Sequence, residues 1–143
     1  MTRTDTKLCK EILHRFKFSQ TIFLSTCSGK KPKVRPVTLI YLNKKFWVST
    51  GSKDAKVKQI KKNKNFEFCF FLETRKYFGY IRGSGRAVLI KDLKTRKSFV
   101  DSIEFPEEYR KDASDPGFAL IRLDIKDIEY KKPGEMEVKR LRF

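Results

Sequence analysis

The sequence predicts a mainly β fold with a few helices, in which antiparallel strands close into a barrel. Short runs of β-branched and aromatic residues recur along most of the chain, and turn residues separate them. A longer strand is predicted at residues 77–90, where three glycines are typical of a strand that bends or bulges at a barrel corner. These observations favour a barrel over a flat sheet. The other predicted strands are residues 21–27, 33–42, 46–50, 66–73 and 118–130.

The length and composition of the chain indicate one domain. Its 143 residues include 39% apolar residues and thirteen phenylalanines, which is enough material for one packed core. We expect a single domain over residues 1–143, with an N-terminal helix at about 5–17, the barrel at about 18–130 and a C-terminal tail at 131–143. The tail is expected either to add an edge strand or to stay mobile.

The opening segment has the pattern of an amphipathic helix. Apolar residues recur at helical spacing between residues 5 and 17, and Thr4 or Asp5 is available as the N-cap. The apolar positions are Leu8, Ile12, Leu13 and Phe16.

The first three strands are joined by short turns at residues 28–30 and 43–45, so we expect them to run antiparallel. A small polar turn at 51–54 then leads into a helix. The apolar residues of that helix are Ala55, Val57 and Ile60.

The strand at 66–73 is expected to be central, because both of its faces are apolar near its end. A second short helix is predicted at 93–103, and a polar loop with two prolines at 105–117. The apolar residues of the central strand are Phe66, Phe68 and Phe70 on one face and Cys69 and Phe71 on the other.

The chain is strongly basic. It carries 34 Lys and Arg against 17 Asp and Glu, a formal net charge of +17 and a pI of about 10.0. Such a charge favours anionic partners, which include nucleic acids, acidic protein or membrane surfaces and phosphorylated small molecules. The basic residues run from Arg3 to Arg142, and a solvated surface explains most of them.

The cysteines and the single histidine do not form a metal motif. Cys9, Cys27 and Cys69 are widely spaced, and His14 is the only histidine, so neither a zinc site nor a disulfide framework is expected. We expect buried thiols in a reducing compartment. No apolar run is long enough to span a membrane, and the N-terminus lacks an apolar signal core, which predicts a cytoplasmic protein without membrane contact.

The stretch from Val34 to Ile60 has the features of an anion site. Two strand-like runs lead into a turn of small hydroxyl residues, and a lysine-bearing helix begins directly after it. The backbone N–H groups at a helix N-terminus lack partners within the helix, so such a turn can surround a phosphate with donors and positive charge.

Residues in this stretch also have structural interpretations. Arg35 could pair with a surface carboxylate, and Lys56 is one of six lysines between residues 53 and 64, any of which could simply be solvated. Pro36 inside a strand-like run indicates an edge or a bulge, where a ligand can meet the backbone. We interpret the adjoining aromatic residues as core rather than as cover for a ring. They are Phe46 and Trp47.

Catalysis by side chains alone is not expected. His14 is interpreted as a surface residue, and no Ser/His/Asp, Cys/His or paired-carboxylate arrangement can be assembled from the sequence. If the protein is an enzyme, a cofactor carries the chemistry.

The order of these motifs resembles the pyridoxamine 5'-phosphate oxidase-like family of flavin-binding split barrels. The shared features are RPV on a strand, WVST before a turn, Lys56 and Gln59-Ile60 on the following helix, and GSGRA on a bent strand. The resemblance covers roughly residues 18–130. It implies a six-stranded antiparallel split β-barrel that forms a homodimer, with flavin mononucleotide (FMN) in a groove at the interface. Related members use a deazaflavin or haem instead, and a deazaflavin remains an alternative here.

The resemblance also implies roles for individual residues. A flavin phosphate is doubly charged, so the Arg35 fork and the Lys56 ammonium suit it, and neighbouring hydroxyls could donate to it. Ala55 stands where the oxidases carry a further basic residue, which weakens the phosphate grip. The cofactor-binding residues implied are Arg35, Pro36, Val37, Thr38, Ser49, Thr50, Lys56 and Tyr80.

The C-terminus departs from the oxidases that give the family its name. They place Arg and His in a substrate-recognition segment there, whereas this chain ends in KRLRF and its histidine is far upstream. The sequence therefore predicts a flavin-dependent oxidoreductase of unknown substrate, with a reduced nicotinamide as a possible donor. The alternatives are a flavin-binding or redox-sensing protein without turnover and, less favoured, a basic nucleic-acid-binding module, suggested by the net charge and the aromatic and glycine-rich stretch at 76–87.

Overall fold

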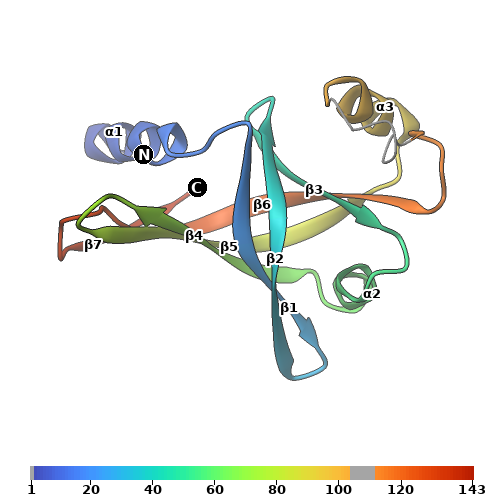
Figure 1. Ribbon diagram of the computed structural model, residues 1–143, viewed down its shortest axis with the longest axis horizontal. Helices are drawn as coiled ribbons and strands as arrows, with labels where there is room; N and C mark the ends of the chain where they lie inside the picture. Colours follow the sequence, from blue (N-terminus) through green and yellow to red (C-terminus); the bar gives the residue numbers. More distant parts are fainter. Residues whose placement is uncertain (1, 104–111) are drawn as a thin grey trace.

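The computed structural model describes residues 2–103 and 112–143, which form three helices and seven strands (Figure 1). The helices are α1 (Arg3–His14), α2 (Ala55–Lys62) and α3 (Leu93–Asp101). The strands are β1 (Ser19–Ser28), β2 (Lys31–Leu42), β3 (Lys45–Gly51), β4 (Asn65–Glu73), β5 (Phe78–Ile90), β6 (Phe118–Lys131) and β7 (Val138–Arg142). None of the helices in these described ranges is long and apolar enough to cross a membrane.

Six of the strands close into an antiparallel barrel, which confirms the predicted split-barrel fold. Neighbouring strands follow the order β3-β2-β1-β4-β5-β6, and β3 pairs with β6 to close the ring. The closing ladder sets Val48 opposite Ile121. β7 pairs with the far end of β6, outside the ring, so the C-terminal tail adds an edge strand.

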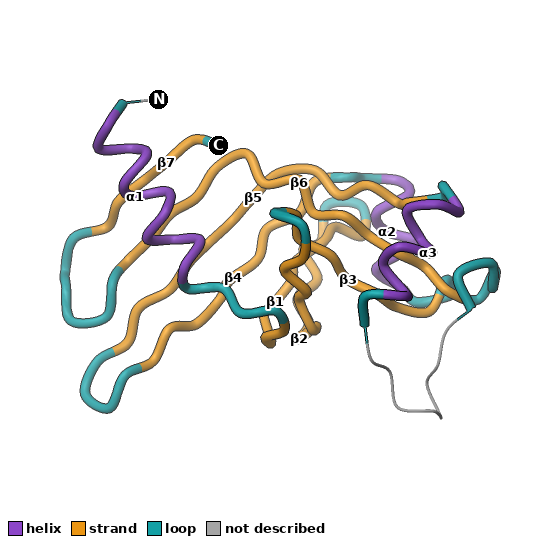
Figure 2. The backbone as a smooth tube through the Cα atoms, turned by 90° about the horizontal axis from the view of Figure 1, so that it is seen from above, coloured by secondary structure: helices purple, strands orange, loops and turns teal. Residues whose placement is uncertain are grey.

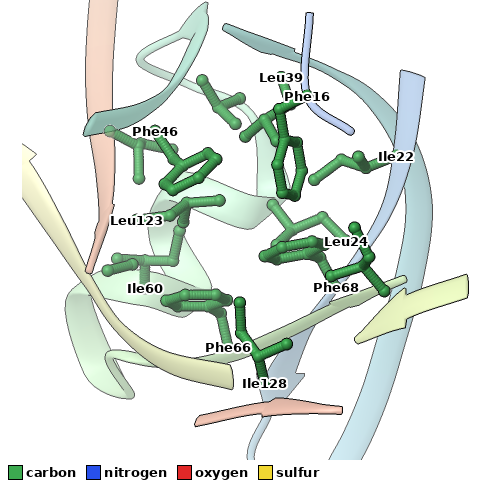
Figure 3. Close-up of a cluster of buried hydrophobic side chains, with 14 of the residues drawn as sticks. Phe16, Ile22, Leu24, Leu39, Phe46, Ile60, Phe66, Phe68, Leu123 and Ile128 are labelled. Carbon is green, nitrogen blue, oxygen red and sulfur yellow. The ribbon is translucent and has the colours of Figure 1, made fainter. Parts of the chain in front are cut away.

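The barrel interior is filled by the inward residues of alternating strands, as Figure 3 shows. On β1, Ile22 and Leu24 point inward and are fully buried, whereas Phe23 between them is 47% exposed on the outer face. Phe68 lies opposite Leu24 on β4, which runs between β1 and β5 as the central strand predicted from its sequence. Phe71 on the outer face of β4 stays half exposed.

Helix α1 covers one side of the barrel, and its predicted N-cap was wrong. Ile12 is fully buried. The Phe16 ring, just after the helix, packs edge-on against the Phe46 ring, with 4.9 Å between the ring centroids. The N-cap is Thr2, whose hydroxyl accepts a hydrogen bond from the Asp5 backbone N–H at 3.1 Å. The Asp5 carboxylate accepts in turn from the Thr2 N–H, which forms a capping box two residues earlier than expected.

Helix α3 covers a second, smaller cluster on the outside of β2, β3 and β6. Trp47 from β3 packs there against Phe99 of α3, and both are almost fully buried, which confirms the core interpretation of the tryptophan. Residues 105–111 of the predicted loop lie outside the described residues, and 112–117 form turns.

Strand β5 bends as its glycines predict. Its register against β6 shifts between Ser84 and Gly85, which is the mark of a β-bulge. A Cβ added at Gly85 would overlap the backbone carbonyl oxygen of Asp124, so the two strands approach too closely there for any larger residue.

We expect Gly85→Ala to lower the free energy of unfolding by about 1–3 kcal/mol, because the methyl group must push the two strands apart. Urea denaturation measures this change. Ser84→Ala is the matched control, and removing its half-buried hydroxyl should change stability by less than about 0.5 kcal/mol. Equal stability of the two variants would contradict the close approach.

Candidate functional site

Strands β2 and β3 pair over three residues only and then separate. The three pairs are Ile40–Trp47, Tyr41–Phe46 and Leu42–Lys45. Before Ile40, β2 pairs with β1, and after Trp47, β3 pairs with β6. Helix α2 follows β3 directly and turns Val57 and Ile60 into the barrel core beside this opening. The elements of the predicted anion site therefore meet where the sheet splits (Figure 1).

Arg35 points into the barrel end beneath α2, and neutral oxygens receive its hydrogen bonds. Its guanidinium donates to the Thr26 hydroxyl at 2.7 Å, to the Gln59 side-chain oxygen at 2.9 Å and to the Leu24 carbonyl at 3.3 Å. Burial lowers the pKa of Arg35 from its ordinary value. Among the residues that the structure describes, no carboxylate pairs with it, so the surface ion pair considered from sequence is not formed.

Gln59 connects three elements of the site, and sequence reasoning gave it no such role. Its side-chain oxygen accepts from Arg35 of β2 and from the hydroxyl of Thr26 on β1, at 2.5 Å. Thr26 is 1% exposed. In the sequence, only its place among the inward-facing residues of β1 indicates that its hydroxyl could reach Arg35 and Gln59. These bonds hold a partly buried cation without neutralising it.

Lys56 is not a freely solvated lysine. Its side chain is 13% exposed, and its ammonium lies 3.0 Å from the Asp54 carboxylate. Asp54 also accepts from the Thr50 hydroxyl, and the hydrogen bonds from Thr50 and then Lys56 lower the pKa of this carboxyl. Asp54 precedes α2 as its N-cap but makes no side-chain capping bond. Thr50 and Lys56 thus converge on one anionic group.

The two basic residues approach the same side of α2. Lys56 and Gln59 are three residues apart, so their side chains are neighbours on the helix surface, and Gln59 is bonded to Arg35. A groove of about 490 Å³ runs alongside, between α2 and the β1–β2 turn, and Gln59 lines it. The other residues that line it are Cys27, Ser28, Gly29, Ala55, Lys58, Lys62 and Asn63.

The remaining predicted residues of β2 and β3 divide between two faces. Val37 points inward with Arg35 and packs against the barrel core, whereas Pro36 and Thr38 are exposed on the outer face. Ser49 is partly buried on β3, opposite Leu120. The side chains of consecutive residues in a strand cannot all meet one ligand face.

Tyr80 lies away from the other predicted residues within one chain. Its hydroxyl donates to Glu129 at 2.9 Å, a bond that raises the pKa of Tyr80. Strand β5 lies near α2 at its other end, where Ala87 and the two residues after it line a groove with Ile60 and Lys61. Tyr80 and Ala87 are seven positions apart along the strand, which is a distance of about 20 Å. The structure therefore joins Thr50 and Lys56 through Asp54, places Arg35 against Gln59 of the same helix, and leaves Tyr80 elsewhere.

The cysteines are less buried than expected. All three thiols are free and partly buried, which corrects the prediction of buried thiols, and burial raises the pKa of Cys69. His14 is exposed at the end of α1. Within residues 2–103 and 112–143, no group of three His, Cys, Asp or Glu side chains could hold a metal ion.

Residues 8–132 of the chain match the family model described as pyridoxamine 5'-phosphate oxidase. The chain belongs to the pyridoxamine 5'-phosphate oxidase family. A comparison with curated proteins finds no significant match.

Several solved structures share the fold of this family member. A NimC/NimA family protein from Clostridium acetobutylicum has a TM-score of 0.75 at 16% identity, with 100% of both chains covered. General Stress Protein 26 from Bacillus anthracis has a TM-score of 0.68 at 21% identity, with 99% of this chain and 100% of that chain covered. A pyridoxamine 5'-phosphate oxidase-related, FMN-binding protein from Nostoc punctiforme has a TM-score of 0.67 at 14% identity, with 100% and 97% covered.

We expect Gln59→Leu to lower the free energy of unfolding by about 1.5–3 kcal/mol, because Arg35 loses a hydrogen bond to a charged donor and stays partly buried. Gln59→Glu is the matched variant: its carboxylate can still accept from Arg35, so stability should stay near or above that of the unchanged protein. Thermal and urea unfolding measure both. A Gln59→Leu variant as stable as the parent would contradict the role given to this residue.

Proposed function

We propose that this chain binds FMN at the opening between β2 and β3, with Arg35 and Lys56 holding the phosphate. The observation that carries the proposal is the unneutralised guanidinium of Arg35, which is hydrogen-bonded to Gln59 on the same helix that carries Lys56. A phosphate carries nearly two negative charges and accepts several hydrogen bonds, which suits a planar fork, an ammonium and a hydroxyl at one place.

The residues fit a phosphate in one further respect. The Asp54 carboxylate receives the hydrogen bonds of Thr50 and Lys56, so this pair of donors is already oriented toward an anionic oxygen. The same carboxylate would compete with a phosphate for Lys56. Because residue 55 is an alanine and not a basic residue, binding of the phosphate would depend on Arg35 and Lys56.

Membership of the pyridoxamine 5'-phosphate oxidase family and the FMN-binding description of the Nostoc punctiforme neighbour support FMN as the ligand. Bound FMN supplies two-electron hydride chemistry, so the chain needs no acid–base cluster of its own. We propose a flavin-dependent oxidoreductase that accepts a hydride from a reduced nicotinamide.

We further propose that two copies form a homodimer through the outer face of β2, β1 and β4. Val34 is 69% exposed there, and Phe23 and Phe71 are about half exposed, which is a large apolar area for a free surface. Tyr80 lies opposite Phe71 on the same outer face. A second copy against this face would bring its own Tyr80 toward Pro36, which accounts for the distance between these residues within one chain.

Removing either basic side chain should weaken FMN binding more than riboflavin binding, because riboflavin lacks the phosphate. For Arg35→Ala and Lys56→Ala we expect a loss of about 1.5–3 kcal/mol for FMN only. Flavin fluorescence titration measures both affinities. Lys10→Ala, an exposed lysine on α1, is the control that should leave both unchanged. Equal losses for the two flavins would remove the phosphate role.

Phe23→Glu should convert the dimer into monomers and weaken FMN binding at least tenfold, because it places a charge in the proposed apolar interface. Light scattering after size-exclusion chromatography gives the mass, and flavin titration gives the affinity. Leu93→Glu, at an exposed position on α3, is the control and should leave the dimer intact. A Phe23→Glu protein that stays dimeric, or a monomer that binds FMN as tightly, would contradict this interface.

A further inference from the structure

The positive charge of the chain is concentrated around α2 and the β1–β2 turn. Residues 28–65 contain twelve of the 34 Lys and Arg residues but only one of the 17 acidic residues, Asp54. That carboxylate is already bonded to Lys56. We propose that this surface binds the phosphate backbone of double-stranded nucleic acid. It is called the basic face below and consists of Lys30, Lys31, Lys33, Lys58, Lys61, Lys62, Lys64 and Lys91.

Helix α2 forms a ridge between two grooves, and lysines line both. Lys58 and Lys62 line the groove of about 490 Å³ toward the β1–β2 turn. Lys61, Lys64 and Lys91 line a second groove, of about 360 Å³, toward the end of β5. The two grooves place positive charge on both sides of one short helix, and the β1–β2 turn projects beside it (Figure 1).

The lysines of the basic face are available for an external anion. All eight are exposed, and within the described ranges none of them takes part in an ion pair. Lys58 and Lys62 are one helical turn apart, with Cβ atoms about 5–6 Å from each other. Several free ammonium groups in a row favour a polyanion, because each phosphate contact releases condensed counterions.

The surroundings of the basic face favour nucleic acid over a membrane. Proteins that lie on anionic membranes combine basic residues with apolar anchors. In the part of the chain that the structure describes, Val34 is the only large apolar residue between residues 28 and 65 that is strongly exposed, and it lies on the outer face of β2. Charge without an apolar anchor suits a hydrated phosphate backbone.

The same surroundings favour a duplex over a single strand. Single-strand binding without sequence preference combines a basic groove with aromatic side chains on which bases stack. The exposed aromatic residues of the described chain lie on or beside other elements, and none is part of the basic face. They are Phe18, Phe23, Phe71, Tyr77, Phe78 and Phe143. A surface of lysines alone reads phosphates and not bases, so binding is independent of sequence.

The basic face is separate from the proposed cofactor site. Arg35 is partly buried and Lys56 is 13% exposed, and neither belongs to the basic face. A nucleic-acid-binding module is less favoured from the sequence, but contacts to the phosphate backbone need only exposed positive charge and no dedicated nucleic-acid-binding fold. The protein should therefore bind a duplex equally well with and without saturating FMN.

The test compares two variants that lose the same charge. Lys58→Gln/Lys61→Gln/Lys62→Gln removes three charges from the basic face, and Lys7→Gln/Lys10→Gln/Lys17→Gln removes three exposed charges on and after α1, at the other end of the molecule in Figures 1 and 2. Fluorescence anisotropy with a labelled duplex of about 20 base pairs gives the affinity between about 50 and 200 mM salt. Circular dichroism melting confirms that both variants fold.

We expect the α2 variant to bind at least tenfold more weakly and to reduce the slope of log K against log salt by about 2–3, because each lost phosphate contact contributes about 0.9 to it. The α1 variant should keep the parent slope. An equal fall in both variants would show an effect of net charge alone and overturn the proposal. Tighter binding to phosphatidylserine vesicles or to a single strand of the same length would also overturn it.

Discussion

Strands β2 and β3 share three residue pairs and then separate, and the arrangement of the site depends on this separation. Beyond Ile40 and Trp47 the two strands pair on their other sides, so α2 can pack into the opening with Val57 and Ile60. The opening would expose the barrel end if the helix did not cover it. The hydrogen bonds from Arg35 and Thr26 to Gln59 fix the helix against β1 and β2 and hold a cation under it.

The fold was predictable because it depends on patterns that repeat along the chain. The alternation of inward and outward residues identified the strands, and the glycines of β5 identified the bend at Ser84 and Gly85. The N-cap of α1 was misplaced because Thr2, Thr4 and Asp5 are all good capping residues, and only the backbone conformation selects Thr2.

The sequence predicted which charged residues lie near the opening between β2 and β3, but not which side chains they hydrogen-bond. Arg35, Thr50 and Lys56 were identified from residue type and order, and the structure brings them to one opening. The role of Gln59 depends on its contacts with Thr26 and Arg35, which lie 33 and 24 residues away in the sequence, and no local pattern contains them. The partners of Asp54 are near it in the sequence, at Thr50 and Lys56, but residue types alone do not show that the three side chains meet. Tyr80 was included in the site because of the family resemblance. Its position in the sequence does not show that β5 carries it away from α2.

The basic residues of this region act at two depths. Arg35 and Lys56 are partly buried, and in the proposed cofactor site they would bind a compact anion through charge and hydrogen-bond geometry. The exposed lysines of α2 and the β1–β2 turn form a broad surface, where charge alone acts and salt screens it. The buried and the exposed basic residues would therefore have different functions, and α2 carries residues of both groups.

The most direct test of the cofactor site is the stoichiometry of FMN bound to the purified full chain, measured by flavin absorbance after removal of free ligand. The structure and the family membership predict a flavin spectrum equimolar with the chain, either as purified or after incubation with FMN. A folded protein that neither carries FMN nor takes it up would contradict the site proposed between β2, β3 and α2.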